Sequence, residues 1–147
     1  MVGVEFDFVV TDCLKALELY ESIFPVERIE VTAYPKGSNE AVFSIFGSRF
    51  HMLDENPDYM LFAPKAENPQ SFWFNILVED IQETYQKAMA ASCTEIQPVT
   101  EMPAMGASNA MFADAFGYVW MLHQIHREVS FEERCQVMEE MMEETQK

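Results

Sequence analysis

The feature that most constrains this chain of 147 residues is an internal repeat. Matching residues keep a nearly constant separation, which drifts only from 68 to 70 positions: Asp12 and Asp80, Gly37 and Gly106, Ala41 and Ala110, Phe43 and Phe112, Phe46 and Phe116, Gly47 and Gly117, and Phe50 and Trp120. A period this long, in only two copies, excludes a solenoid. The repeat instead predicts a duplicated module, and each copy must bury the sheet face that its own helix leaves open.

Each copy reads as a strand, a helix and three further strands. In the first copy, alternation predicts a strand over residues 4–10, a helix capped by Thr11 or Asp12 and stopped by Pro25, a strand over 28–34 and a hairpin of 41–46 with 49–53. In the second copy the corresponding segments are a strand over 72–78, a helix capped by Asp80, a strand over 96–99 and a hairpin of 109–113 with 118–124. The chain is therefore expected to be an α+β protein.

The whole chain, residues 1–147, is expected to be a single domain. We assign the first module to residues 4–53, a proline-containing linker to 54–70 and the second module to 71–126, and we expect the modules to form a mixed, curved eight-stranded sheet around a pocket. Ser130 to Glu133 form a capping box that opens a C-terminal helix over 131–144. Its apolar stripe needs a partner, which is either the body of the protein or a second subunit.

Charge and composition exclude several functions. The chain has 25 acidic against nine basic residues and a net charge of −16, which argues against binding nucleic acid or an anionic membrane surface. No apolar run reaches the roughly 18 residues that span a bilayer, and the first residues do not resemble a signal peptide. Cys13, Cys93 and Cys135 are odd in number and far apart, so we expect buried or half-buried thiols in a cytoplasmic protein.

Two motifs carry a family resemblance. The opening Phe8-Val9-Val10-Thr11-Asp12, with the helix through Glu21, resembles the vicinal oxygen chelate superfamily of glyoxalases, bleomycin resistance proteins and extradiol dioxygenases. The closing segment from Asp114 to Trp120 is similar to the Asp-Pro-Phe-Gly-His-x-Trp ending of its PhnB-like branch, with Ala115 and Tyr118 as departures. The resemblance covers roughly residues 4–126 and implies a pocket shared by the two modules.

The resemblance also implies four metal-ligand positions, which fall on Glu5, His51, Trp73 and Met121. Only Glu5 and His51 suit a divalent ion, because tryptophan is no ligand and the methionine thioether prefers Cu(I). Two protein ligands are fewer than a catalytic site normally has. We therefore expect no cofactor, although a divalent metal is possible on Glu5 and His51, with His123 as a third donor after rearrangement and Asp7 as a fourth.

The expected pocket is asymmetric. The first module contributes polar groups and the second contributes mainly apolar ones, and the expected pocket residues are Glu5, Asp7, Arg49, His51, Trp73, Asn75, Met121 and His123. Arg49 is the expected partner of Asp7. His51 is open to three interpretations: a hydrogen-bonded pocket or core histidine, a ligand contact, or a metal ligand.

This asymmetry favours a metal-independent protein that binds small amphipathic molecules, cationic ones in particular. The alternative is a metal-dependent lyase, isomerase or dioxygenase that uses Glu5 and His51, and a third hypothesis is a structural or regulatory dimer built on the C-terminal helix. The resemblance also implies a homodimer, to which the C-terminal helix is a candidate contributor. The sequence identifies neither the ligand nor a catalytic residue, and no Gly-x-Gly loop supports a nucleoside cofactor.

Overall fold

A computed structural model describes residues 1–65 and 70–146 of the chain. The first module contains β1 (Asp7–Val10), α1 (Cys13–Ile23), β2 (Val26–Val31), β3 (Glu40–Ile45) and β4 (Ser48–Asp54). Its sheet has the order β1-β4-β3-β2, in which β1 and β4 are parallel and the other neighbours are antiparallel. A short 3₁₀ helix, η1 (Pro57–Tyr59), follows in the segment predicted as the linker, of which residues 66–69 lie outside the described parts.

The second module repeats this plan. It contains β5 (Phe74–Leu77), α2 (Ile81–Ala90), β6 (Thr94–Met102), the 3₁₀ helix η2 (Pro103–Met105), β7 (Ala107–Ala113) and β8 (Val119–Ile125). The order β5-β8-β7-β6, again with one parallel pair, matches the first sheet strand for strand. The predicted α+β fold of two βαβββ modules is confirmed.

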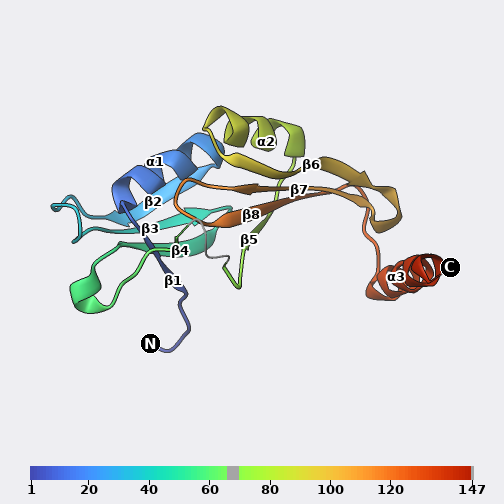
Figure 1. The fold of residues 1–147 in the computed structure, drawn as a ribbon, viewed down its shortest axis with the longest axis horizontal. Helices are drawn as coiled ribbons and strands as arrows, with labels where there is room; N and C mark the ends of the chain where they lie inside the picture. Colours follow the sequence, from blue (N-terminus) through green and yellow to red (C-terminus); the bar gives the residue numbers. More distant parts are fainter. Residues whose placement is uncertain (66–69, 147) are drawn as a thin grey trace.

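Both helices cover the same side of the molecule. Figure 1 shows α1 and α2 side by side above the sheets. Each helix begins where the sequence predicts, because the carboxylates of Asp12 and Asp80 accept hydrogen bonds from the backbone N–H groups of Lys15 and Glu83 at 3.2 and 3.1 Å. Between helices and sheets lies a core whose largest fully buried side chains are Trp120, Tyr20, Phe43, Phe112, Leu17 and Met52.

The strands differ from the prediction in their ends and in their grouping. All eight are present, but in the described parts of the chain they form two sheets of four, with no ladder joining the modules. β1 begins at Asp7 and not at residue 4, and β5 begins at Phe74, which leaves Trp73 outside the strand. A strand extends only as far as its neighbour offers hydrogen bonds, and local alternation does not reveal that limit.

The C-terminal helix α3 (Phe131–Thr145) stands apart from both sheets and contacts η2 (Figure 1). The Oγ of Ser130 accepts a hydrogen bond from the N–H of Glu133 at 3.1 Å, so the predicted cap is confirmed. Cys13 and Cys93 are buried and Cys135 is half-buried, all as free thiols. Within the described residues, no helix combines the length and the apolar character that crossing a membrane requires.

Candidate functional site

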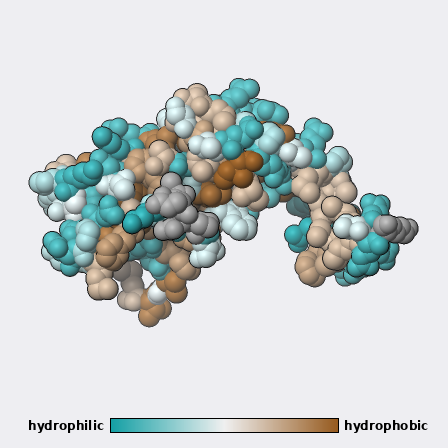
Figure 2. All heavy atoms as spheres, in the orientation of Figure 1, coloured by the Kyte–Doolittle hydropathy of each residue, from teal (hydrophilic) through white to brown (hydrophobic). Residues whose placement is uncertain are grey.

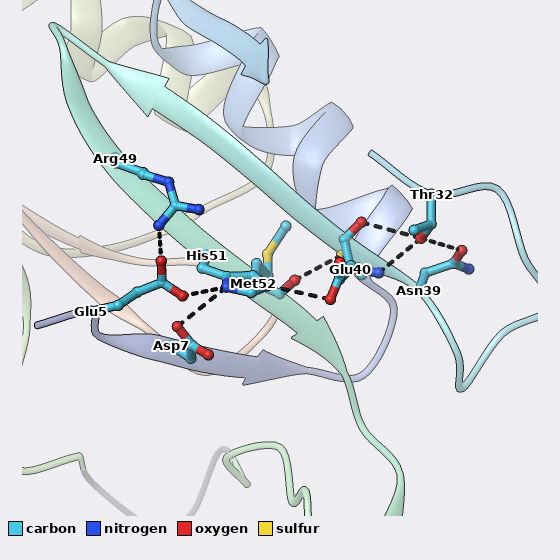
Figure 3. Close-up of polar contacts among 9 residues, drawn as sticks. Glu5, Asp7, Thr32, Asn39, Glu40, Arg49, His51 and Met52 are labelled. Carbon is cyan, nitrogen blue, oxygen red and sulfur yellow. Dashed lines mark hydrogen bonds and ion pairs between the residues drawn. The ribbon is translucent and has the colours of Figure 1, made fainter. Parts of the chain in front are cut away.

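The parallel pairing of β1 with β4 creates the polar part of the site. It places Asp7 beside His51, and the two-residue period of each strand adds Glu5 and Arg49 on the same face. The alternate residues Phe8 and Val10 are buried in the core. Figure 3 shows Glu5 and Asp7 reaching from the β1 segment toward His51 on β4.

His51 is surrounded by carboxylates. Its Nδ1 lies 2.5 Å from Oε1 of Glu5 and 3.4 Å from Oδ1 of Asp7, and its Nε2 lies 3.4 Å from Oε2 of Glu40. The Nε2 atom is buried without a hydrogen-bond partner among the described residues, and the side chain as a whole is only 16% exposed. Arg49 forms an ion pair with Glu5 and not with Asp7, contrary to the sequence prediction.

A pocket of about 670 Å³ adjoins these polar groups. Its walls are aromatic and come from both modules, while Glu5, Asp7 and Arg49 form its polar part; the five aromatic residues are Phe6, Phe8, Phe50, Phe72 and Phe74. The rings pack on one another, with centroids 5.1 Å apart for Phe8 and Phe74 and 5.5 Å apart for Phe72 and Phe74. We call this space the junction pocket. Its size is typical of sites for small organic ligands.

The four residues predicted from the second module lie elsewhere. Trp73 is 53% exposed and does not line the junction pocket. Asn75 and Met121 are neighbours across β5 and β8, and His123 lines a separate groove next to α3. Partial burial lowers the pKa of His123, which keeps the imidazole neutral near pH 7. Of the eight predicted residues, the structure therefore brings together Glu5, Asp7, Arg49 and His51.

The sequence profile of the Glyoxalase/Bleomycin resistance protein/Dioxygenase superfamily matches residues 4–122. The chain belongs to this superfamily. No curated protein matches the chain by sequence. The family relationship agrees with the paired βαβββ modules, whereas membership of the PhnB-like branch stays a prediction.

Solved structures of the superfamily fold resemble the chain over most of its length. The fosfomycin resistance protein FosX from Listeria monocytogenes, in complex with Mn(II) and sulfate, has a TM-score of 0.67 at 16% identity and covers 94% of this chain and 98% of its own. FosX from Mesorhizobium loti has a TM-score of 0.64 at 14% identity and covers 92% of this chain and 98% of its own. TioX from Micromonospora sp. ML1 has a TM-score of 0.63 at 15% identity and covers 88% of this chain and 100% of its own. Similarity at this level of identity establishes the fold.

The polar cluster fits a divalent metal ion by its donor set. One ligand atom each from Glu5, Asp7 and His51 lies within 4.8 Å of the other two. Carboxylate oxygens with one imidazole nitrogen suit Mn(II), Fe(II) or Zn(II). Three protein ligands also meet the minimum of a catalytic metal site, which the two ligands foreseen from the sequence did not. The sequence predicted His123 as the third donor and Asp7 as the fourth. In the structure Asp7 joins Glu5 and His51 in the cluster, and His123 lies outside it.

The aromatic wall was missed by the sequence analysis. The sequence predicts strands over residues 4–10 and 72–78, which include Phe6, Phe8, Phe72 and Phe74, but it places none of the four in the pocket. The available signal was the recurrence of two phenylalanines, two residues apart, at the start of each module: Phe6 with Phe8, and Phe72 with Phe74. In the structure these two pairs meet at the junction pocket.

Proposed function

We propose that this chain is a metal-independent binding protein for small cationic amphipathic molecules, and that the junction pocket is its site. The observation that carries the proposal is the combination of five phenylalanine walls with two carboxylates in one pocket of about 670 Å³. Each square ångström of apolar ligand surface removed from water contributes roughly 25 cal/mol. Aromatic faces also attract cations.

The charges of the pocket favour a cation over an anion. Arg49 is paired with Glu5, and among the described residues the carboxylate of Asp7 has only the 3.4 Å contact to His51. A net charge of −16 adds an overall field that draws cations toward the protein. The superfamily name includes bleomycin resistance proteins, so drug binding is among the functions that the fold supports.

A pair of matched probes tests this proposal. N-methylacridinium and neutral acridine have nearly the same shape and differ in charge, and their affinities can be measured by fluorescence at pH 8 with EDTA present. We expect Asp7→Asn to weaken the cation about tenfold and acridine little, and Phe72→Ala to weaken both. Asp58→Asn, on η1, is the control and should change neither. A wild-type protein that binds neither probe, or Asp7→Asn affecting both equally, would contradict the proposal.

The second candidate is a metal-dependent lyase, isomerase or dioxygenase that uses Glu5, Asp7 and His51. It is favoured by the convergence of three donors and by the Mn(II) in the FosX structure. A bound ion would act as a Lewis acid on a substrate oxygen. The phenylalanine walls would hold the substrate, and Glu40 would accept a proton from Nε2–H of His51 or keep that ring oriented.

Metal analysis separates the two candidates. The protein is purified without chelator and its content of Mn, Fe, Zn and Ni is measured, followed by Mn(II) titration calorimetry of the metal-free form. One equivalent of metal in the wild type that is lost in both Glu5→Gln and His51→Gln would favour the enzyme. The variant Asp58→Asn again serves as the control.

We further propose a homodimer that acts in the cytoplasm. Val4 and Phe6, which line the junction pocket, are exposed, as are Phe62 and Trp73, which do not line it. Exposed apolar surface marks interaction sites when it forms a large patch. The mass of one chain is 17.0 kDa. Sedimentation velocity at micromolar protein concentration should give twice this mass. A monomer up to 100 µM would contradict the proposal.

A further inference from the structure

A second groove, of about 580 Å³, lies between α3 and the face of the second sheet turned away from α1 and α2. Figure 2 shows the molecule hollowed between its body and this helix. α3 begins at Phe131, beyond the residues 4–122 that match the superfamily. One wall of the groove, α3, thus lies outside the superfamily match, whereas the lining residues of β6, η2 and β7 lie within it; we call this space the tail groove.

The walls of the tail groove are apolar and adaptable. Four methionines line it, one at the end of β6, one in η2 and two on α3, together with Ile125 of β8 and Phe131; the methionines are Met102, Met105, Met138 and Met142. Methionine has three rotatable bonds and a polarizable sulfur, so such walls adjust to ligands of different shape. The amide of Asn109 donates to the sulfur of Met102 at 3.0 Å, which fixes one of these side chains.

Two potential hydrogen-bond donors of the groove have no acceptor among the described residues. Within residues 1–65 and 70–146, no carboxylate lies within 4.0 Å of the Arg134 guanidinium, whose Cζ lies over the Phe131 ring, 5.7 Å from the ring centroid. The other is the ring of His123, which makes no side-chain hydrogen bond in the same part of the chain.

We propose that the tail groove binds a small apolar molecule that carries one anionic group, a carboxylate or a sulfonate. The methionines, Ile125 and Phe131 surround the apolar body, and the guanidinium of Arg134 pairs with the anion, for which its planar fork of donors is suited. Glu139 also lines the groove and repels a second anionic group, which limits the ligand to one. This site is independent of the junction pocket and of the function proposed for it.

Two dyes of nearly the same shape test the proposal: 8-anilinonaphthalene-1-sulfonate, which is an anion, and N-phenyl-1-naphthylamine, which is neutral. Both fluoresce in apolar surroundings, so their affinities for the full-length protein can be titrated in 0.15 M NaCl, where the repulsion of distant charges is screened. We expect Arg134→Gln to weaken the anionic dye about tenfold and the neutral dye less than twofold. Lys15→Gln, which removes a cation on α1, is the matched control and should change neither.

Further variants locate the dyes and keep the test decisive. Met138→Asp should weaken both dyes at the tail groove, whereas Phe72→Ala in the junction pocket should leave the anionic dye unaffected. Far-UV circular dichroism of each variant confirms that α3 is still formed. The proposal is wrong if Phe72→Ala and not Met138→Asp removes binding, or if Arg134→Gln leaves the anionic dye unaffected. A second copy of the chain that fills the groove would also contradict the proposal. In that case the wild type binds neither dye, and Met138→Asp converts a dimer into a monomer.

Discussion

At the residue scale, the segment from Asp114 to Trp120 has a structural role. The buried carboxylate of Asp114 accepts hydrogen bonds from the hydroxyl of Tyr20 at 2.7 Å and from Nε1 of Trp120 at 2.9 Å. Its other oxygen accepts from the backbone N–H groups of Phe116 and Tyr118 at 2.8 and 3.1 Å. One side chain thus shapes the turn before β8 and satisfies two buried donors, one of them from the first module.

Replacing Asp114 should be strongly destabilising. Asp114→Ala leaves the Tyr20 hydroxyl and the Trp120 indole N–H buried without an acceptor, at about 1–3 kcal/mol each. We expect the free energy of unfolding in urea to fall by about 3 kcal/mol or more. Asp58→Ala, on the exposed η1, is the control and should stay within about 0.5 kcal/mol of the wild type. Equal stabilities of the two variants would refute this role of Asp114.

The buried tyrosines make the fold sensitive to alkali. Burial, with the charge of Asp114, raises the pKa of Tyr20 well above its ordinary value, and burial raises the pKa of Tyr118 to about 12. The neutral form is therefore favoured in the folded state, so this stability is complete below about pH 10 and is lost as the pH rises toward 12. Burial likewise raises the pKa of Cys93 to about 11, which acts in the same direction.

Urea unfolding at a series of pH values measures this effect. The midpoint should hold steady from pH 8 to about 9 and fall continuously up to pH 11.5. Absorbance at 295 nm should show Tyr20 ionising only together with unfolding. A midpoint that is constant to pH 11.5 would show that the burial of these hydroxyls is not maintained in solution.

The sequence predicted half of the candidate site for a physical reason. Arg49 and His51 are two residues apart in β4, and Glu5 lies two residues before Asp7, the first residue of β1; the repeat places the two strands in one module. Period-two alternation therefore fixes a common face. The sequence did not predict where the other four side chains lie, because their positions depend on how the modules pack and on where α3 lies. Local sequence patterns carry no information on either; the four residues are Trp73, Asn75, Met121 and His123.

At the scale of elements, capping residues were the most reliable signal. Asp12, Asp80 and Ser130 each begin a helix as predicted, because a cap is a local hydrogen bond between residues three apart. Strand ends were less predictable. β6 runs from Thr94 to Met102, far beyond the predicted 96–99, because β7 pairs with it along a path that includes two irregularities in register. Pairing, a tertiary property, decides such ends.

The attachment of α3 depends on Gly106. Its carbonyl accepts hydrogen bonds from the backbone N–H groups of His126 and Arg127 at 2.7 and 3.1 Å, which ties the segment before α3 to η2. Its φ is +66°, and a Cβ built on it would lie 2.6 Å from the carbonyl oxygen of Arg127. A side chain here would therefore push the connecting segment away.

Gly106→Ala should loosen this attachment. We expect a loss of about 3 kcal/mol, the sum of a left-handed backbone and a steric clash. Gly47→Ala is the matched control, because Gly47 also has a positive φ, +81°, but open space around its Cβ position, so about 1 kcal/mol is expected. Urea unfolding gives the two values. Hydrogen exchange should also be faster at residues 126–129 in Gly106→Ala alone, and identical behaviour of the variants would contradict the clash.

At the scale of the whole molecule, the two modules share interactions that cross between them. The hydroxyl of Tyr118 in the second module donates to the carbonyl of Val9 in the first at 2.7 Å, and the Tyr20 ring lies 5.0 Å from that of Trp120. Neither module can be removed without exposing the aromatic core of the other. The prediction that residues 1–147 act as one domain therefore has a physical basis in this shared core.

A shared core predicts that both modules unfold in one step. Cys13 is fully buried in the first module, and Trp120 is fully buried in the second, where its ring also packs on Tyr20 of the first. The variant Trp73→Phe leaves Trp120 as the single tryptophan. In this background, the fluorescence of Trp120 and the reactivity of the Cys13 thiol toward a disulfide reagent should change at the same urea concentration. The reason is that unfolding of either half exposes apolar surface of the other. Cys93→Ser and Cys135→Ser, added to that background, leave Cys13 as the single thiol. If the thiol of Cys13 becomes reactive at a urea concentration where Trp120 is still buried, the modules are separate folding units and the shared core contributes little to their stability.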